Sequence, residues 1–399
     1  MTDFRNPFRP GAGHMPPYLA GRNPEIDNFK EIIKQDIILD NVVLTGLRGV
    51  GKTVLLETLK PVAIQSGWWW VGTDLSESAS VSEDNIAIRL LTDLSVVTSN
   101  IVMGKQELRR IGFTDSSETC DITLNYSLLQ DIYNRAPGLV ADKLKRILNL
   151  VSEAIKPLHK NGIIFAYDEA QNLSDQDQKG QYPLSLLLDV FQSIQRSDIP
   201  FMLLFSGLPT LFPKLVEART FAERMFRVIF LDRLSDKDSK DAILKPIEVD
   251  NCPIKLTEKS VESILSISKG YPYFIQFICR EAYDAFIQNI SGSGNSGIPV
   301  EEILRKLDSD FFAGRWAKVT DRQRELLTVI AQLDNAVTEF TVQEIVDLSK
   351  KVANKPFSNS HVNQMLLSLF KAGLIYKNRY GKYSFAVPLI NEFILRRMQ

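Results

Sequence analysis

Short apolar runs recur along the first 232 residues, and amphipathic segments of helical period separate them. Each run has the length of a strand and carries consecutive apolar residues, which is typical of a strand that is buried on both faces. Strands that alternate with helices indicate an α/β fold, a parallel sheet with helices on both faces. The predicted strands are residues 41–45, 68–72, 162–167, 200–206 and 227–231.

The helical pattern differs along the chain. A first helix is expected over residues 24–35, because Asn23 is a suitable cap and Pro24 suits the first helical position. After residue 231 the pattern is helical, with helices expected at 235–245, 258–268 and 272–288. Residues 100–141 are less regular, and we expect a partly helical insertion without an assigned function. Residues 289–297 are rich in Gly and Ser and are expected to form a flexible loop.

A third module begins near Ala313. Three amphipathic helices are predicted at 320–333, 341–349 and 360–371, and two short strands follow around an Asn-Arg-Tyr-Gly turn. Three helices and a hairpin are the pattern of a winged helix-turn-helix domain. We therefore expect three domains: an α/β core over residues 1–232, a helical domain over 233–312 and a winged helix over 313–399.

Composition and charge narrow the class of protein. The chain is 44% hydrophobic and 24% charged with a formal net charge of −1, which excludes a disordered chain and a strong global attraction to nucleic acid or membranes. From Arg315 to the end, however, there are 13 Lys and Arg against 7 Asp and Glu. Such a basic module suits either a polyanionic partner or a solvated surface.

Cysteine and histidine usage predicts neither a disulfide framework nor a zinc site, because Cys120, Cys252 and Cys279 lie far apart and the three histidines are scattered. No apolar window approaches the length of a membrane span. A cytoplasmic location with no membrane partner is therefore expected by default.

A phosphate-binding motif joins the first predicted strand to the next helix. The residues Gly-Leu-Arg-Gly-Val-Gly-Lys-Thr match GxxxxGK[ST], whose glycines let loop amides approach phosphate oxygens at a helix N-terminus. We expect Lys52 to bridge the β- and γ-phosphates of ATP and Thr53 to give its hydroxyl to Mg²⁺. The predicted nucleotide contacts are Gly46, Leu47, Arg48, Gly49, Val50, Gly51, Lys52, Thr53 and Val54.

Two carboxylates end the strand predicted at residues 162–167. Asp168 suits the role of holding Mg²⁺, and Glu169 suits that of polarising an attacking water. A capped or solvated acidic pair is the alternative interpretation. With the phosphate-binding motif upstream, the pair favours an enzyme that hydrolyses ATP.

At these residues the chain resembles the AAA+ ATPases, and the whole looks closest to the branch of origin-recognition initiators and transposition regulators. The resemblance implies that Ser206 is the first sensor of the γ-phosphate, although a small polar strand end has the same pattern. It implies an arginine finger, Arg224 rather than Arg227, that reaches the ATP of a neighbouring subunit in a homo-oligomer. A surface ion pair is the alternative for either arginine. It also implies that Tyr18 and Arg22 belong to a stretch that packs against adenine, for which an ordinary Pro/Gly turn is the alternative.

The helical domain would then be the lid of the ATPase core. Its Gly-Tyr-Pro segment resembles the lid of switch-type (STAND) ATPases and places Pro272 near the nucleotide, unless this proline only begins a helix. The second-sensor arginine that family lids often carry is missing. This departure favours a slow nucleotide switch over motor-like hydrolysis.

The winged helix has two candidate partners. If it binds duplex DNA, the helix at 360–371 would enter the major groove and the hairpin would contact phosphates. If it binds a protein effector, the chain would be a STAND-like signalling or defence ATPase. We favour an ATP-dependent, DNA-associated switch over this alternative and over a scaffold without turnover. The candidate DNA contacts are Ser358, Ser360, His361, Asn363 and Gln364 in the helix, and Lys377, Arg379 and Lys382 in the hairpin.

Overall fold

The structure is a computed structural model that describes residues 5–35, 37–109, 117–248, 252, 254–290, 298–379 and 381–398. The chain divides into two compact units. The sheet unit comprises residues 23–45 and 55–230, and the lid–wing unit comprises residues 1–22, 46–54 and 231–399.

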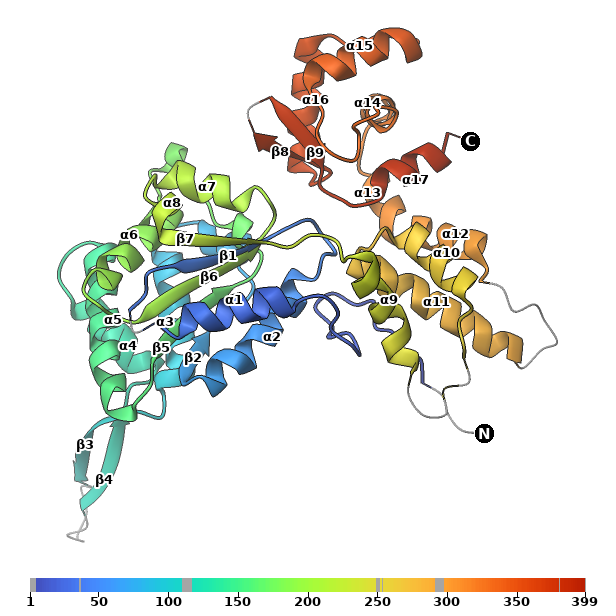
Figure 1. The fold of residues 1–399 in the computed structure, drawn as a ribbon. Helices are drawn as coiled ribbons and strands as arrows, with labels where there is room; N and C mark the ends of the chain where they lie inside the picture. The colour runs from blue at the N-terminus through green and yellow to red at the C-terminus, as the bar shows by residue number, and fades with distance from the viewer. Residues whose placement is uncertain are drawn as a thin grey trace. The chain divides into compact units, whose positions relative to one another are not determined.

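A five-stranded parallel sheet in the order β2-β5-β6-β1-β7 forms the centre of the sheet unit (Figure 1). Every residue of the three inner strands is buried, whereas the two edge strands are partly exposed. The prediction of a parallel α/β sheet is therefore confirmed, with strand ends within one residue of those expected. The strands are β1 (Asn41–Thr45), β2 (Trp68–Val71), β5 (Gly162–Tyr167), β6 (Phe201–Gly207) and β7 (Phe226–Phe230).

Helices cover both faces of this sheet. Trp70 of β2 packs edge to face on Phe29 of α1, and Phe165 of β5 packs on Phe191 of α6. Because Trp70 pairs with Ile164, the neighbour of Phe165, these two contacts lie on opposite faces. The helices are α1 (Asn23–Ile33), α2 (Lys52–Gln65), α3 (Glu83–Thr98), α4 (Tyr126–Arg135), α5 (Val140–Ile155), α6 (Pro183–Gln195), α7 (Leu211–Ala218) and α8 (Ala222–Met225).

The insertion at 100–141 is partly helical, as expected, since it includes α4, but it also holds a hairpin that was not predicted. It contains an antiparallel hairpin of β3 (Val102–Arg109) and β4 (Ser117–Thr123) before α4, and residues 110–116 lie outside the described part. The hairpin extends away from the helices of the sheet unit (Figure 1). The strands were missed because few of their residues are apolar, so that no alternating pattern marks them.

The helical half of the lid–wing unit follows β7 in the chain. Its predicted helices are present, while residues 291–297 of the predicted flexible loop lie outside the described residues. A short π-helix, η6 (Asp308–Phe312), joins the helical half to the winged helix. The helices are α9 (Asp236–Leu244), α10 (Glu258–Ser268), α11 (Pro272–Ile290), α12 (Val300–Leu307) and α13 (Ala313–Trp316).

The C-terminal elements form the predicted winged helix. Thr320 and Thr341 begin the first two helices as capping boxes with Gln323 and Glu344, and Ser358 caps the third. One apolar core runs from the lid helices into this domain. The elements are α14 (Asp321–Ala331), α15 (Val342–Val352), α16 (Asn359–Lys371), β8 (Ile375–Arg379), β9 (Lys382–Phe385) and α17 (Ile390–Arg396). In the part of the chain that the structure describes, no helix has both the length and the apolar character that crossing a bilayer demands.

Candidate functional site

The loop of residues 46–53 follows β1 directly and ends in the first turn of α2. Gly49 and Gly51 have φ angles of 78° and 91°, in the left-handed region that favours glycine. Gly46 has a different steric reason, because a Cβ atom there would overlap the backbone carbonyl oxygen of Leu231. The glycines of the motif are therefore needed by the loop's own geometry.

Lys52 is folded into this loop. Its Nζ atom donates to the carbonyl oxygen of Gly46 at 3.0 Å and to that of Leu47 at 2.9 Å, and the residue is only 9% exposed. A buried ammonium group is costly unless it is well bonded. Its presence places a positive charge inside the glycine-rich loop.

Arg22 anchors the same loop from the N-terminal segment. One of its terminal nitrogens, Nη2, donates to the carbonyl oxygens of Val50 and Asp232, at 2.9 Å and 2.8 Å, and the residue is 6% exposed. Tyr18, by contrast, lies at the surface. The sequence suggested an adenine contact for both residues, and the structure adds for Arg22 a role in holding the loop that the sequence did not reveal.

The lid segment around Pro272 meets the loop within the lid–wing unit. Pro272 is the first residue of α11, and the amide of Tyr273 donates to the carbonyl oxygen of Gly49 at 3.1 Å. Gly270 has a φ of 78° and accepts a bond from the amide of Leu234 at 2.8 Å. The Gly-Tyr-Pro segment is thus both a helix start and a neighbour of the loop.

The acidic pair lies at the carboxyl end of β5 in the sheet unit. Asp168 is buried, and its Oδ1 atom accepts the amide of Glu169 at 2.8 Å. Glu169 itself has a left-handed backbone with a φ of 50°, which is uncommon for a residue other than glycine. Such conformations gather at functional sites, where the surrounding structure holds them in place.

Two buried hydroxyl groups lie unbonded at the same edge of the sheet. The Oγ atom of Ser206, at the end of β6, and the Oγ1 atom of Thr45, at the end of β1, have no hydrogen-bond partner within the described residues. The two strands are neighbours, and Ser206 pairs with Leu44. Buried polar atoms are rarely left unsatisfied, so this edge suits a polar ligand.

Asp74, which follows β2, was not predicted from the sequence as a site residue. Its neighbour Leu75 donates an amide bond to the carbonyl oxygen of Asp168 at 2.9 Å, so the two acidic segments run side by side. Burial raises the pKa of Asp74 above its ordinary value of 3.8, and the charges of Asp168 and Glu169 raise it further. The available signal was its place after a strand, since the carboxyl ends of parallel strands share one edge.

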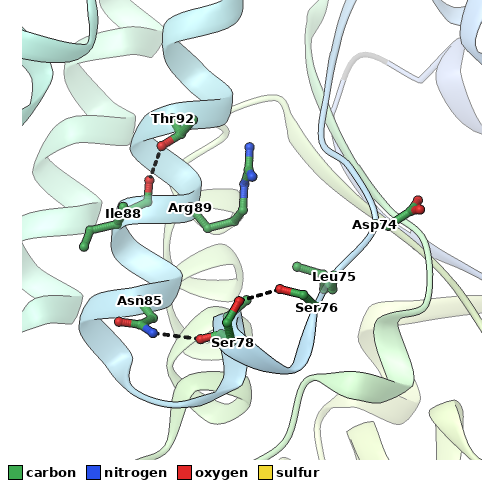
Figure 2. Close-up of a pocket in the computed structure, with 9 residues that line it drawn as sticks. Asp74, Leu75, Ser76, Ser78, Asn85, Ile88, Arg89 and Thr92 are labelled. Carbon is green, nitrogen blue, oxygen red and sulfur yellow. Dashed lines mark hydrogen bonds between the residues drawn. The ribbon is translucent and has the colours of Figure 1, made fainter.

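A pocket of about 320 Å³ opens beside Asp74 (Figure 2). Arg89 of α3 lines it and donates through Nε to Oδ2 of the buried Asp93 at 3.0 Å. The same carboxylate oxygen accepts the hydroxyl of Tyr167 at 2.7 Å, and burial raises the pKa of this tyrosine well above 10.0. The pocket is thereby linked to the residue that precedes Asp168.

The side chains at this edge of the sheet could supply only part of the ligands of a Mg²⁺ ion. Across the residues open to description, no three His, Cys, Asp or Glu side chains converge on a complete metal site. Mg²⁺ is ordinarily held by one or two carboxylates together with phosphate oxygens and waters. Asp168, a buried carboxylate of the sheet unit, is a donor of the type that this arrangement needs.

The two candidate arginine fingers differ in their bonding. Arg227 on β7 forms an ion pair with Asp40, its Nη2 atom 3.1 Å from Oδ2, and donates to Asn28 at 3.1 Å. Arg224 on α8 is exposed, and its side chain has no bonding partner among the residues that the structure covers. Arg224 is therefore the arginine that is available to a second molecule.

The candidate DNA-binding residues are spread over the winged helix. Asn363, Gln364 and Lys377 are exposed, whereas His361 and Lys382 are half-buried. The side chain of Arg379 lies outside the described part of the structure. The exposed side of α16 also carries two large apolar residues that the sequence did not single out as surface features, Leu367 at 62% and Phe370 at 43% exposure.

Comparisons with known proteins agree with this architecture. Residues 309–394 match the model of a family described as a domain of unknown function, DUF8462. No protein of the curated set matches the chain. A Walker-type ATPase of Pyrococcus abyssi superimposes with a TM-score of 0.59 at 14% identity, over 94% of this chain and 96% of the other.

The ORC2 protein of Aeropyrum pernix is similar in two structures. Its ADP form has a TM-score of 0.53 at 15% identity, over 98% of this chain and 97% of that one. Its ADPNP–ADP complexes give a TM-score of 0.51 at 14% identity, with 98% of each chain covered. The resemblance to origin-recognition AAA+ ATPases is thus confirmed as a likeness of fold, which spans sheet, helical lid and winged helix.

Proposed function

We propose that this protein is an AAA+-type molecular switch that binds and hydrolyses ATP and acts together with duplex DNA. The observation that carries the proposal is the strand order. It brings the carboxyl end of β1, which runs into the glycine-rich loop, to the same edge as the acidic end of β5 and the unbonded hydroxyl of Ser206. Ligands of open α/β sheets bind at this edge.

Each residue has a defined task in this proposal. The loop amides and Lys52 hold the phosphates, Thr53 and Asp168 hold Mg²⁺, and Glu169 accepts a proton from the attacking water. Ser206 bonds to the γ-phosphate or that water. Mg²⁺, when bound, neutralises negative charge on the phosphates.

The proposal extends to domains and subunits. We assign residues 1–232 to the ATPase core, 233–312 to the lid and 313–399 to the winged helix. Arg224 acts on the ATP of a neighbouring copy, a role supported by its exposure and by the absence of a bonded side chain among the described residues. Since the Gly-Tyr-Pro segment of the lid carries no arginine, turnover is slow.

Two variants test the ATPase. Lys52→Ala is expected to lose ATP binding, whereas Glu169→Gln is expected to keep binding and to lose turnover by about a hundredfold or more. Binding is measured by calorimetry with Mg²⁺ and turnover by phosphate release. Unchanged ATP affinity in Lys52→Ala would remove the proposed site.

DNA involvement is tested separately. ATP turnover and oligomeric mass are measured with and without duplex DNA, and DNA affinity is measured as a function of salt. Neutralising Lys377 and Lys382 together is expected to lower the slope of log affinity against log salt by about one to two units. A flat salt response and DNA-independent turnover would count against DNA.

A protein effector is the second candidate, and one observation favours it. Leu367 and Phe370 expose apolar surface on α16, the helix that would enter the major groove. Replacing both by Ser separates the candidates, because a DNA complex depends on polar and basic groups, whereas a protein complex depends on apolar contacts. Retained DNA affinity in this variant supports the DNA-binding proposal.

A further inference from the structure

The side chain of Glu169 is held by a residue two positions further along the chain. The amide nitrogen Nε2 of Gln171 donates a hydrogen bond to Oε2 of Glu169. A hydrogen bond to a charged acceptor is stronger and more directional than one between neutral groups. This contact therefore fixes the direction in which the carboxylate points.

The orientation of the Gln171 amide is itself determined by the turn after β6. Its Oε1 atom accepts the backbone amide of Leu208 at 3.1 Å. A backbone N–H can only donate, so the oxygen of the carboxamide must face Leu208 and its nitrogen must face Glu169. One planar amide thus connects the turn that follows Ser206 to the acidic pair.

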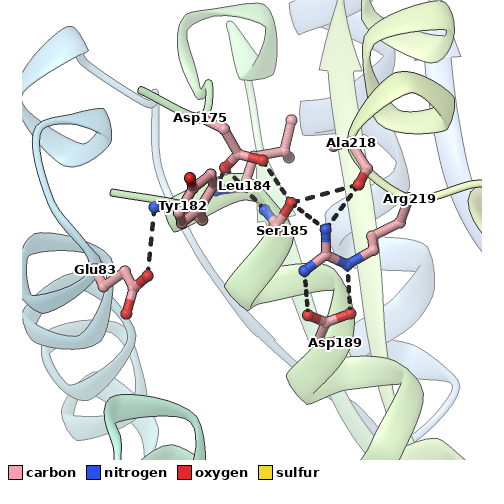
Figure 3. Close-up of polar contacts among 8 residues, drawn as sticks. All are labelled: Glu83, Asp175, Tyr182, Leu184, Ser185, Asp189, Ala218 and Arg219. Carbon is pink, nitrogen blue, oxygen red and sulfur yellow. Dashed lines mark hydrogen bonds and ion pairs between the residues drawn. The ribbon is translucent and has the colours of Figure 1, made fainter. Parts of the chain in front are cut away.

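The backbone of Gln171 is fixed from a third side. Lys214 of α7 donates through Nζ to the carbonyl oxygen of Gln171 at 2.7 Å, and burial lowers the pKa of this lysine. The end of α7 is tied to α6, because Arg219 donates to both carboxylate oxygens of Asp189 at 2.8 Å and 2.6 Å (Figure 3). The side-chain amide of Gln171 can therefore move with the turn at Leu208 while the backbone of Gln171 stays in place.

Gly207 leaves the space that this amide occupies. A Cβ atom on Gly207 would lie 2.6 Å from Oε1 of Gln171 and 2.9 Å from the side chain of Leu211. Both atoms are the ends of flexible side chains, so alanine would fit after they move. The substitution would displace the amide without touching either carboxylate.

We propose that Gln171 is a positioning residue that sets the direction of the Glu169 carboxylate and couples it to the turn at Gly207 and Leu208. The proposal rests on the ATP hydrolysis proposed above. Because Ser206 immediately precedes this turn, a movement of Ser206 would change the orientation of the Glu169 carboxylate. Movement of the sensor strand would align or misalign the carboxylate through a single amide.

Three variants test the coupling. Gln171→Ala removes both hydrogen bonds and is expected to lower kcat by about tenfold to a hundredfold, because small misplacements of a reacting group cost this much. Gln171→Glu keeps an acceptor for Leu208 but sets a carboxylate against Glu169, so it should lose as much activity. Gly207→Ala should reproduce the loss, and the double variant with Gln171→Ala should add little to it.

Two further measurements show whether a loss of kcat comes from the position of Glu169: the affinity for ATP and the activity of a matched control variant. Since the side-chain hydrogen bonds of Gln171 go to Glu169 and Leu208, both in the sheet unit, the ATP dissociation constant should stay within about twofold in every variant. Gln130 provides the control, because its amide is also bonded at both ends, to Tyr126 at 2.8 Å and Asn134 at 3.1 Å. Gln130→Ala should leave kcat unchanged.

The outcomes separate this inference from the proposed function. If Glu169→Gln abolishes turnover while Gln171→Glu keeps wild-type kcat, hydrolysis stands and the positioning role is wrong, since a merely structural glutamine tolerates this isosteric change. If the wild-type protein neither binds nor hydrolyses ATP, both proposals fall. Additive losses in the Gly207→Ala, Gln171→Ala double variant would overturn the coupling.

Discussion

The substitution Arg22→Ala tests whether Arg22 holds the glycine-rich loop in place. The guanidinium group joins three separate parts of the lid–wing unit: the N-terminal segment, the loop at Val50 and the chain after β7 at Asp232. Alanine removes both hydrogen bonds and leaves two carbonyl oxygens without their donor. The variant should therefore loosen the loop before it affects the rest of the unit.

The size of the effect follows from burial. The bond to Val50 is buried, so its loss costs about 2 to 3 kcal/mol, as expected for a bond from a charged donor whose acceptor is left unsatisfied. The bond to Asp232 is partly buried, and water can replace some of it, for about 0.5 to 1 kcal/mol. Together the two bonds give about 3 kcal/mol, which corresponds to roughly a hundredfold change in an opening equilibrium.

Hydrogen exchange measures this opening directly. Amides of residues 46–54 should lose about a hundredfold of protection in Arg22→Ala, while those of α14 keep theirs. Arg233→Ala is the matched control, because this arginine is exposed in the same unit and its loss should change stability by less than about 0.5 kcal/mol. If the two variants change loop protection equally, Arg22 does not hold the loop and the reasoning from burial is wrong.

Three further predictions follow from the geometry. Gly46→Ala should abolish ATP binding, because the added Cβ atom would overlap a backbone carbonyl oxygen. In Gly51→Ala the added Cβ atom meets open space, so this variant should cost only the strain of its φ angle, about 1 to 2 kcal/mol. Calorimetric ATP titrations compare the two variants. Arg224→Ala should lower ATP turnover about a thousandfold in the oligomer and Arg227→Ala by less than tenfold, measured by phosphate release with the oligomeric mass verified. Burial alone would raise the pKa of Glu344, but hydrogen bonds from Thr341 outweigh burial and lower this pKa below its ordinary value of 4.5. The ionised carboxylate therefore stabilises the fold above pH 4.5, and this stabilisation is lost as the pH falls through the pKa of the folded state. In urea unfolding, the stability of Glu344→Gln should differ from that of the wild type at pH 7 and converge with it at low pH.

The sheet could be predicted because its inner strands are buried on both faces. Runs such as residues 162–167 and 200–206 have no polar interruption, and burial on both faces leaves that signature in a single sequence. The hairpin of β3 and β4 has no such burial requirement, since its own residues Val102, Met103 and Ile122 are exposed. Its strands are held by pairing between residues up to 21 positions apart, which local pattern does not encode.

The residues of the candidate site also fall into two classes, those that a local motif identifies and those that depend on distant contacts. The glycine-rich loop and the acidic pair are local motifs, so the sequence alone identifies them as candidates. Asp74 and Gln171 depend on distant partners: Asp74 becomes significant because β2 pairs with β5, and Gln171 because Leu208 lies 37 positions away. A residue whose role is to orient another through tertiary contact has no spacing rule by which to find it.

The winged helix is connected to the glycine-rich loop by packing rather than by a flexible linker. The amide of Tyr273 bonds to Gly49, and the ring of Tyr273 lies 5.0 Å from that of Phe311 in the π-helix. The neighbouring Phe312 stacks at 5.0 Å on Phe393 of α17, and both belong to one buried core. Close-packed interiors shift between discrete arrangements rather than deforming gradually. Under the proposed function, a change at Gly49 when ATP binds is therefore expected to reach α16 as a movement of the whole winged helix, which is what a switch requires and a passive scaffold does not.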